Sequence, residues 1–429
     1  MNILMFGKVP PIQGGVSKAT WQAALDLADA GHSIDIVSNA EAMPPGFRQM
    51  MTQEDRTRMC AYPNLRCHMT EPLGPFSYIP WSEPYVSQLL GIGLRVSAER
   101  VPDLIIGWYF EPYGLVANIM GERLGKPVIL RHAGSDIGRL ALHRDLREAY
   151  RYMLSSADCV MTSLKQDAVQ LLKDAGVQED RLRPTRGRQL GAEFFEHDQL
   201  NLSEVAKSAE AVFDSYDLPD VLRQTLRDWN EAALENAAPT LGTYGKIAEV
   251  KGTYQLIDAL DNLAAAEVPF RFAALWSATT GRFAHCLKYL TARQNLKGRA
   301  LILPPLPSWS IPAFIRSCDA VAFLENRFPI SIHGPQVPRE VLACGRPLIL
   351  SGEIFDKLFF RDQLVAGANV AIVTDPDDRE DLAEVVRNVL DDESLRKSLG
   401  HHAATLSRVI EVNAHPYDEI VDVLEEIKM

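Results

Sequence analysis

Short apolar runs alternate with stretches of helical periodicity along most of the chain. An apolar run at residues 3–6 is followed by a loop, a predicted helix at 17–30 and a second apolar run at 33–38. This order forms a β-α-β unit, which implies parallel strands joined by a right-handed crossover. The alternation recurs in the first half of the chain, with further predicted strands at 104–107, 128–131 and 159–163.

A second series of the same kind follows a charged, helix-prone stretch. Its predicted strands are residues 240–244, 270–276, 300–303, 320–324, 347–350 and 370–373. The sequence therefore predicts an α/β fold of two doubly wound, Rossmann-like domains facing each other across a cleft, because such sheets bind ligands at the carboxyl ends of their strands. We expect a first domain at 1–195, a helical insertion or linker at 196–238, a second domain at 239–412, and a C-terminal helix at 413–429 able to pack back on the first domain.

Composition limits the class of protein and its partners. The 429 residues exceed what one core usually supports, in keeping with two domains. A net charge of -12 disfavours nucleic acid and anionic lipid as general partners. The six cysteines are scattered without paired spacing, which argues against a disulfide framework or a structural zinc site. The chain opens on a strand-like run and has no apolar run of about 20 residues, so we expect a cytoplasmic protein.

Two glycine-containing loops follow predicted strands. Gly14 and Gly15 lie between the first strand and the first helix, where backbone amides and the helix dipole suit a diphosphate. A tight turn capped by the following serine is the alternative. The segment 245–252, Gly-Lys-Ile-Ala-Glu-Val-Lys-Gly, carries Lys246 and Lys251 at the two ends of a loop. Each ammonium can donate to a phosphate oxygen, although a lone lysine is commonly a solvated one.

A third segment, 340–347, begins with Glu340 and reads Glu-Val-Leu-Ala-Cys-Gly-Arg-Pro. It predicts a short helix that ends at the glycine before the next strand. Its carboxylate can accept hydrogen bonds from two vicinal ribose hydroxyls, or it interacts only with the helix dipole. Asp375 and Asp377 have the spacing of a metal-binding pair, but a turn before a helix explains them better, so no metal site is predicted.

These segments, in this order, resemble the retaining glycosyltransferases of family four, which have the GT-B architecture. The resemblance covers most of the chain except residues 201–238. It includes the opening Gly-Gly loop, the Gly-Arg-x4-Lys-Gly block with Lys246 in place of arginine, and the Glu-Ala-Met-Ala-Cys-Gly-x-Pro block at 340–347. The resemblance implies an enzyme that moves a sugar, of the hexosyl type, from a nucleotide-diphosphate sugar to an acceptor hydroxyl. It further implies retention at the anomeric carbon, with no metal ion or other cofactor.

The resemblance also implies roles for single residues. The second domain would hold the donor, with Glu340 at the ribose. Diphosphate contacts are implied for Gly14, Gly15, Gly245, Lys246 and Lys251, the two lysines neutralising the diphosphate as it leaves. His132, which ends a predicted strand as the family's histidine does, would face the reacting sugar from the first domain, the acceptor side. No residue has to act as a covalent nucleophile, and the leaving phosphate itself would take the acceptor's proton.

One departure from the family pattern concerns the donor sugar. The family has a second glutamate eight positions before the ribose glutamate, where this chain has Ile332 in a loop that looks longer. Glu325 or His333 would then replace the missing carboxylate, or the loop backbone would do so. The further donor contacts expected in this loop are Gly334, Gln336 and Val337.

The acceptor side is defined less well. Trp108 and Asp136 are candidates there, although core packing explains a tryptophan after a strand equally well. Arginines at 144, 147 and 151 on one face of a predicted helix at 140–155 allow weak contact with a membrane surface or an anionic acceptor, but a solvated face is more common. Two other functions share the expected architecture, a nucleotide-sugar epimerase and a non-catalytic nucleotide-sugar-binding subunit. The base, the donor sugar, the acceptor and the oligomeric state do not follow from these motifs.

Overall fold

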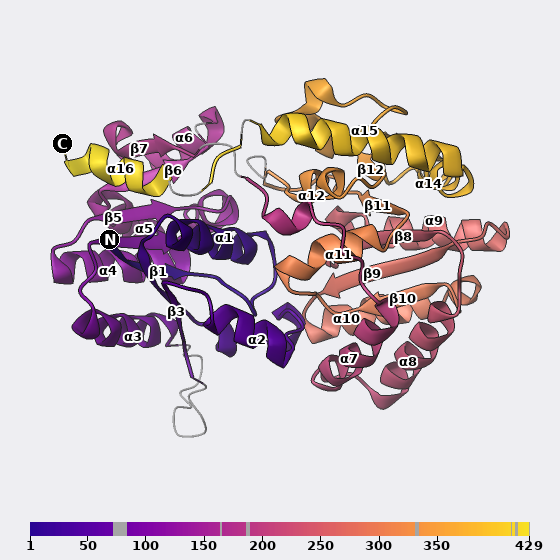
Figure 1. Ribbon diagram of the computed structural model, residues 1–429, viewed down its shortest axis with the longest axis horizontal. Helices are drawn as coiled ribbons and strands as arrows, with labels where there is room; N and C mark the ends of the chain where they lie inside the picture. The colour runs from indigo at the N-terminus through magenta and orange to yellow at the C-terminus, as the bar shows by residue number, and fades with distance from the viewer. Residues whose placement is uncertain are drawn as a thin grey trace.

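The computed structural model describes residues 1–71, 84–163, 165–185, 189–330, 334–412, 414–416 and 419–428. In this part of the chain, two sheets of parallel strands form the centres of two α/β domains that lie side by side (Figure 1). The predicted fold class, two doubly wound halves, is therefore confirmed.

The first sheet has seven described strands in the order β3-β2-β1-β4-β5-β6-β7. They are β1 (Asn2–Gly7), β2 (Ser33–Ser38), β3 (Leu65–Met69), β4 (Leu104–Trp108), β5 (Val128–Arg131), β6 (Cys159–Thr162) and β7 (Leu182–Pro184). The helices around it are α1 (Gly15–Asp29), α2 (Gln53–Cys60), α3 (Tyr85–Glu99), α4 (Leu115–Leu124), α5 (Arg147–Ser156) and α6 (Gln166–Asp174).

The central strand β1 explains why this sheet is covered on both faces. Leu4 and Phe6 belong to the apolar core shared with α3 and α4, whereas Ile3 and Met5 belong to the opposite core, shared with α1. Successive side chains of a strand point to opposite faces, so a strand that is apolar at every position needs helices on both sides.

The second sheet has six described strands in the order β10-β9-β8-β11-β12-β13. They are β8 (Thr240–Lys246), β9 (Arg271–Ser277), β10 (Ala300–Leu303), β11 (Ala320–Phe323), β12 (Leu348–Ser351) and β13 (Ala371–Val373). Helices of this half are α7 (Leu202–Asp214), α8 (Asp220–Leu234), α9 (Thr253–Ala265), α10 (Thr280–Thr291), α11 (Ile311–Arg316), α12 (Val337–Ala343), α13 (Gly352–Lys357), α14 (Arg379–Asp391) and α15 (Glu393–Glu411).

The residues expected as an insertion or linker, 196–238, are mostly helical and share the core of the second domain. Phe213 of α7 and Trp229 of α8 are buried in the same apolar cluster as the second sheet. Asn230 of α8 fixes this packing, since its side chain donates to the carbonyl of Ile302 and accepts from the amide of the same residue.

The last helix, α16 (Glu419–Lys428), returns to the first domain (Figure 1). Ile420, Val423 and Leu424 are buried in the cluster that contains Ile3 and Met5 of β1. The chain therefore crosses between the domains twice, which ties their two cores together.

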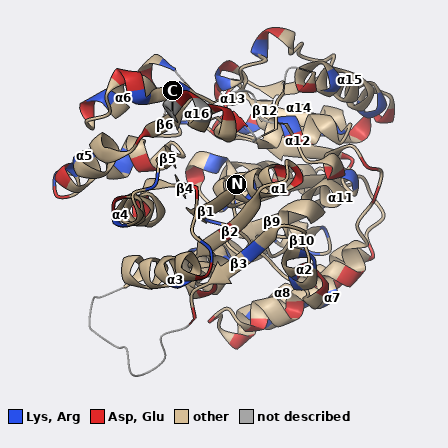
Figure 2. Cartoon of the chain, turned by 60° about the vertical axis from the view of Figure 1, so that its left-hand side comes forward, with Lys and Arg blue, Asp and Glu red and all other residues tan. Residues whose placement is uncertain are grey.

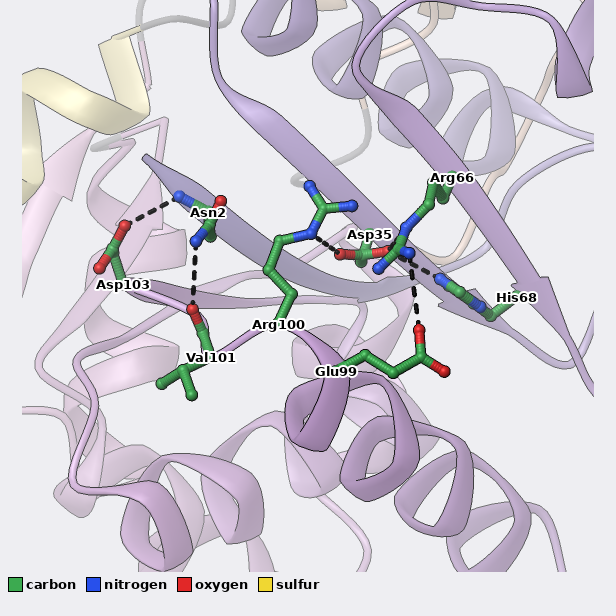
Figure 3. A network of polar contacts seen from close by, with 8 residues as sticks. All are labelled: Asn2, Asp35, Arg66, His68, Glu99, Arg100, Val101 and Asp103. Carbon is green, nitrogen blue, oxygen red and sulfur yellow. Dashed lines mark hydrogen bonds and ion pairs between the residues drawn. The ribbon is translucent and has the colours of Figure 1, made fainter.

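A polar network holds β3 at the edge of the first sheet (Figure 3). Asp35 of β2 is only 3% exposed, and its carboxylate accepts from Arg66 Nε at 2.7 Å and lies 2.8 Å from His68 Nε2. Arg100, which follows α3, lies 3.3 Å from the second carboxylate oxygen. These charges pair residues that are widely separated in sequence, and they explain how a strand as polar as β3 stays attached.

The predicted arginine-bearing helix at 140–155 is a shorter element. After a π-helical turn at Asp136–Leu140, α5 begins only at Arg147. Arg144 pairs with Asp145 and Arg151 with Glu148, so these cations have acidic neighbours. Acidic and basic residues are likewise interspersed on outer helices such as α6 and α15 (Figure 2). Within the described residues, we find no helix with the length and apolar character needed to cross a bilayer.

Candidate functional site

The carboxyl ends of the two sheets meet at the junction between the domains. Lys246, the last residue of β8, has its Nζ 6.0 Å from the centre of the Phe47 ring of the first domain. Gly138 of the first domain lies so close to Ile330 of the second that an added Cβ would be 3.3 Å from the isoleucine side chain. The residues predicted to bind the donor and the acceptor are thus distributed around one junction.

Gly14 and Gly15 form the start of α1 at this junction. Gly14 is the N-cap with φ 109°, a left-handed value that favours glycine, and no side chain caps the helix. Ser17, the alternative cap, is instead buried inside the first turn. A Cβ added to either glycine would meet no atom within 4 Å. The first turn of α1 therefore lies beside unfilled space, and the amides at the start of a helix can bind an anion in such a place.

The lysines of the second domain lie close together. Gly245 is left-handed, with φ 133°, and turns the chain at the end of β8 so that Lys246 enters the junction. Lys251 follows in a short 3-10 turn and forms an ion pair with Glu325, which is 1% exposed. Burial, and then the charges of Lys246 and Lys357, lower the pKa of Lys251, while the contact with Glu325 acts in the opposite direction.

Glu325 was expected to contact the hydroxyls of the donor sugar. Its carboxylate is instead buried against Lys251, whose ammonium also lies 4.3 Å from the centre of the Phe328 ring. The structure therefore makes Glu325 the counter-ion of the loop lysine. A sequence shows that both charges are present but not that they pair across 74 positions.

Lys8 is a cation of the first domain that the sequence reasoning missed. It follows β1, and its Nζ lies 3.7 Å from the centre of the Tyr109 ring. Burial, with the nearby charge of Lys246, lowers the pKa of Lys8 to about 8, while Asp136 acts in the opposite direction. Among the described residues, neither Lys8 nor Lys246 has a hydrogen-bond or ion-pair partner. Two cations from different domains thus interact across the junction, neither of them paired within the described part of the chain, an arrangement suited to binding an anion.

Tyr109 supports Lys8 from an unusual backbone conformation. Its φ is 80°, a value that residues other than glycine rarely adopt. Its hydroxyl lies 2.8 Å from Ser135 Oγ. Backbone strain of this kind is commonly found at binding sites, where the surrounding structure holds it. The strained turn places an aromatic face beneath the ammonium.

Glu340 lies in the short helix α12 and is 5% exposed. Tyr244 donates its hydroxyl to Oε2 at 2.7 Å, and Lys18 of the first domain donates to Oε1 at 2.8 Å. Burial, together with the charge of Glu340, raises the pKa of Tyr244 well above its usual value, so its hydroxyl stays a donor. The predicted ribose carboxylate is therefore oriented by both domains, a role of Lys18 and Tyr244 that no sequence motif indicated.

His132 directly follows β5 and is held by hydrogen bonds. Its Nε2 lies 2.9 Å from Thr162 Oγ1, and its Nδ1 accepts from the amide of Gly134 at 3.4 Å. Because an amide can only donate, the proton of a neutral ring belongs on Nε2. The ring is half-buried, in the loop that leads to Asp136, and its centre lies 6.3 Å from that of the Phe110 ring.

The expectation that Trp108 and Asp136 contact the acceptor directly is wrong. Trp108 is 1% exposed, packs against α1 and lies under the guanidinium of Arg131 at 4.1 Å. Asp136 is fully buried, and its carboxylate accepts from the amides of Phe110, Ala133 and Ile137 at 2.9–3.1 Å. Burial raises the pKa of Asp136 to about 6 despite these bonds. Both side chains shape the loops after β4 and β5 from within.

The loop before α12 is only partly described, and His333 lies outside the described residues. Gly334 is exposed, while Gln336 and Val337 are half-buried at the beginning of α12. Asp375 accepts from the amide of Asp377, so this pair forms a turn, and the cap of α14 is Asp378.

Two family models match the chain. The model of a glycosyl transferase 4-like domain matches residues 14–186, and the model of glycosyl transferases group 1 matches residues 227–405. Comparison with curated proteins finds no match.

Solved structures share the fold over the whole chain. Anabaena HepE in complex with UDP-glucose is 17% identical, with 99% of this chain and 100% of that chain covered and a TM-score of 0.61. Sucrose-phosphate synthase from Thermosynechococcus elongatus is 14% identical, with coverage of 99% and 98% and a TM-score of 0.63. A putative UDP-N-acetylglucosamine 2-epimerase from Listeria monocytogenes is 12% identical, with coverage of 97% and 92% and a TM-score of 0.50. The two family matches, on two parallel sheets that meet at one junction, show that this chain is a glycosyltransferase of the group 1 family with the GT-B fold.

Proposed function

We propose that the enzyme transfers a hexosyl group from a nucleoside-diphosphate sugar to an acceptor hydroxyl, with retention at the anomeric carbon. One observation carries the proposal. Lys8 of the first domain and Lys246 of the second each lack a hydrogen-bond or ion-pair partner among the described residues, and their charges interact across the junction. The turn at Gly14 and Gly15 begins α1 at the same junction. A diphosphate bound there satisfies both cations and the helix end at once.

The chemistry follows from where these cations lie. As the bond from the anomeric carbon to the phosphate oxygen breaks, negative charge grows on the leaving diphosphate, and Lys8, Lys246 and Lys251 stabilise it. Positive groups fixed before the reaction act on the transition state without reorganising. The acceptor oxygen forms its bond to the same face of the sugar, and its proton passes to the leaving phosphate oxygen. Glu340 accepts from the ribose hydroxyls, and His132 lies beside the reacting sugar.

Two carboxylates close to this site have other partners, which supports a mechanism without a covalent intermediate. Asp136 is engaged by three backbone amides, and Glu325 is paired with Lys251. The lysines also supply the charge that a divalent cation supplies elsewhere, so we propose that transfer needs no metal. Activity that survives treatment with a chelator would support this, and activity restored only by Mg²⁺ or Mn²⁺ would refute it.

The identity of the nucleotide base is tested first, by thermal shift with UDP, ADP and GDP. HepE, which shares the fold, binds UDP and UDP-glucose, so UDP is the first probe. A ligand at 100 times its dissociation constant stabilises the folded state by about 2.7 kcal/mol, which is a measurable rise in melting temperature. The Lys246→Met variant is expected to lose most of this rise, whereas Lys297→Met, at an exposed position outside the junction, keeps it. No shift with any of the three nucleotides would overturn the proposal.

The stereochemistry is tested without knowing the acceptor. Slow hydrolysis of UDP-glucose releases glucose, and proton NMR identifies the anomer that forms first. A retaining enzyme releases the α anomer from this α-linked donor, and an inverting one the β anomer. The same spectra examine an epimerase, the activity suggested by the fold of the Listeria protein, because an epimerase changes the donor sugar while no acceptor is present.

A further inference from the structure

Lys18 makes a contact across the domain junction that the proposed chemistry does not use. It lies in the first turn of α1, and its Nζ donates to Glu340 Oε1 at 2.8 Å, although the two residues are 322 positions apart. The two side chains are 18% and 6% exposed. This ion pair is largely shielded from water, and it joins the first domain to α12.

An aromatic ring that packs with the second domain also contacts the Lys18 ammonium. The Lys18 Nζ lies 3.8 Å from the centre of the Phe194 ring. Although residue 194 falls within the range expected for the first domain, this ring is buried in the apolar core of the second sheet. Arg316 donates to the carbonyls of Glu193 and Phe194 and so fixes the turn that carries this ring. Lys18 therefore inserts between a carboxylate and an aromatic face that are both part of the second domain.

The arrangement leaves Glu340 able to accept a ligand. Among the described residues, its two oxygens accept one hydrogen bond each, from Lys18 and from Tyr244, whereas a carboxylate offers about four acceptor positions. Vicinal ribose hydroxyls can therefore add to these two bonds without displacing either. With Lys18 removed, the carboxylate would keep only the tyrosine contact and would lose the cation that fixes its orientation.

We propose that Lys18 is a positioning residue for the donor, which orients Glu340 toward the ribose and makes ribose binding favour the closed arrangement of the two domains. The inference rests on the proposed function, because it assigns Glu340 to the ribose. The coupling arises because Lys18 can reach Glu340 only while the domains are together. A ligand that binds better when Glu340 is oriented in this way shifts the equilibrium toward closure.

Calorimetric titration with two probes tests this role. UDP carries a ribose, whereas inorganic pyrophosphate reaches only the lysines and amides. In Lys18→Met we expect UDP to bind roughly tenfold to a hundredfold more weakly, because Glu340 loses the charged hydrogen bond that orients it toward the ribose, with pyrophosphate affinity unchanged. Lys18→Arg, which keeps the charge, is expected to restore most of the UDP affinity. Lys297→Met serves as the control, and small-angle X-ray scattering is expected to show that UDP compacts the wild type more than Lys18→Met.

The other results are equally informative. UDP affinity that is unchanged in Lys18→Met overturns the inference, and tighter binding would mean that Lys18 competes with the ribose. An equal loss for pyrophosphate would reduce the role of Lys18 to general electrostatic attraction. If Lys18→Met does not fold, Lys18→Gln removes the charge while keeping a hydrogen-bond donor, and a smaller loss of UDP affinity in the same direction is then expected. A wild type that binds none of UDP, ADP and GDP overturns the proposed function together with this inference, whereas wild-type binding with an unaffected Lys18 variant overturns the inference alone.

Discussion

Replacing Lys8 with methionine is expected to change stability and ligand binding in opposite directions. Methionine keeps an unbranched apolar side chain over the Tyr109 ring but removes a charge that has no hydrogen-bond or ion-pair partner among the described residues. The variant should therefore fold more stably than the wild type and bind a diphosphate less well. Opposite changes in stability and in ligand affinity are expected at a residue that serves ligand binding at a cost to the stability of the fold.

The magnitude follows from the pKa of Lys8. A pKa lowered from 10.5 to about 8 means that burying the charged form destabilises the folded protein by roughly 3 kcal/mol below pH 8. Because the folded-state pKa is the lower one, this penalty is complete below pH 8 and disappears as the pH rises toward 10.5. Lys8→Met should remove this penalty and raise the melting temperature by about 2–4 °C for each kcal/mol gained, the usual relation for a domain of this size.

Ligand binding should move the other way. Loss of one hydrogen bond from a charged donor weakens pyrophosphate binding by about 1.5–3 kcal/mol, or roughly tenfold to a hundredfold. Protonated Lys8 is the binding form, so wild-type affinity should fall as the pH rises from 7 to 9, and the variant should show a flatter profile.

Thermal unfolding and calorimetric titration of the wild type, Lys8→Met and Lys297→Met measure both effects. The exposed Lys297 lies away from the junction, so its variant should change neither quantity. A lower melting temperature for Lys8→Met, combined with unchanged pyrophosphate affinity, would refute the reasoning, since it would make Lys8 a structural lysine.

Three other variants test separate parts of the molecule. The double variant Lys251→Met/Glu325→Gln removes both charges of the buried ion pair, so neither charge is left unpaired and the fold should survive. Turnover should fall roughly tenfold to a few hundredfold, and unchanged turnover would contradict the role of Lys251. Gly46→Ala would place a Cβ 1.9 Å from the carbonyl oxygen of Ala278, so the two domains must shift at their junction. We expect this variant to bind UDP more weakly while its melting temperature stays nearly unchanged, because the apolar core of each domain is untouched. Normal UDP affinity would argue against this contact. Burial opposes ionisation of Asp35, but hydrogen bonds from His68 and Arg66 lower its pKa, so Asp35→Asn should lower stability at pH 7 by about 1–3 kcal/mol. This difference should begin to shrink as the pH falls through 3.8, the ordinary value, and should disappear only below the lowered pKa of the folded protein.

The sequence alone was sufficient for the elements whose pattern is local. Strands buried on both faces appear as continuous apolar runs, and residues 300–303 were predicted with the bounds of β10. The glycine loop before α1 and the segments at 245–252 and 340–347 were recognisable because the turn, the helix and their charges lie within a few consecutive residues. By contrast, β3 has no continuous apolar run: its apolar residues alternate with arginine and histidine over only five positions, and no strand was predicted there.

What only the tertiary structure decided is which charges meet. Asp136, Trp108 and Glu325 looked available for ligands, yet folding buries all three, and Glu325 pairs with a lysine 74 positions away. Lys8 and Lys18 belong to no motif, since a lone lysine in a sequence is usually a solvated one. Their positions become significant because two separate sheets bring their strand ends to one junction. A charge that is shielded from water there is destabilised unless an opposite charge or a ligand lies beside it. A linear pattern reports neighbours along the chain, whereas the energy of a charge depends on its neighbours in space.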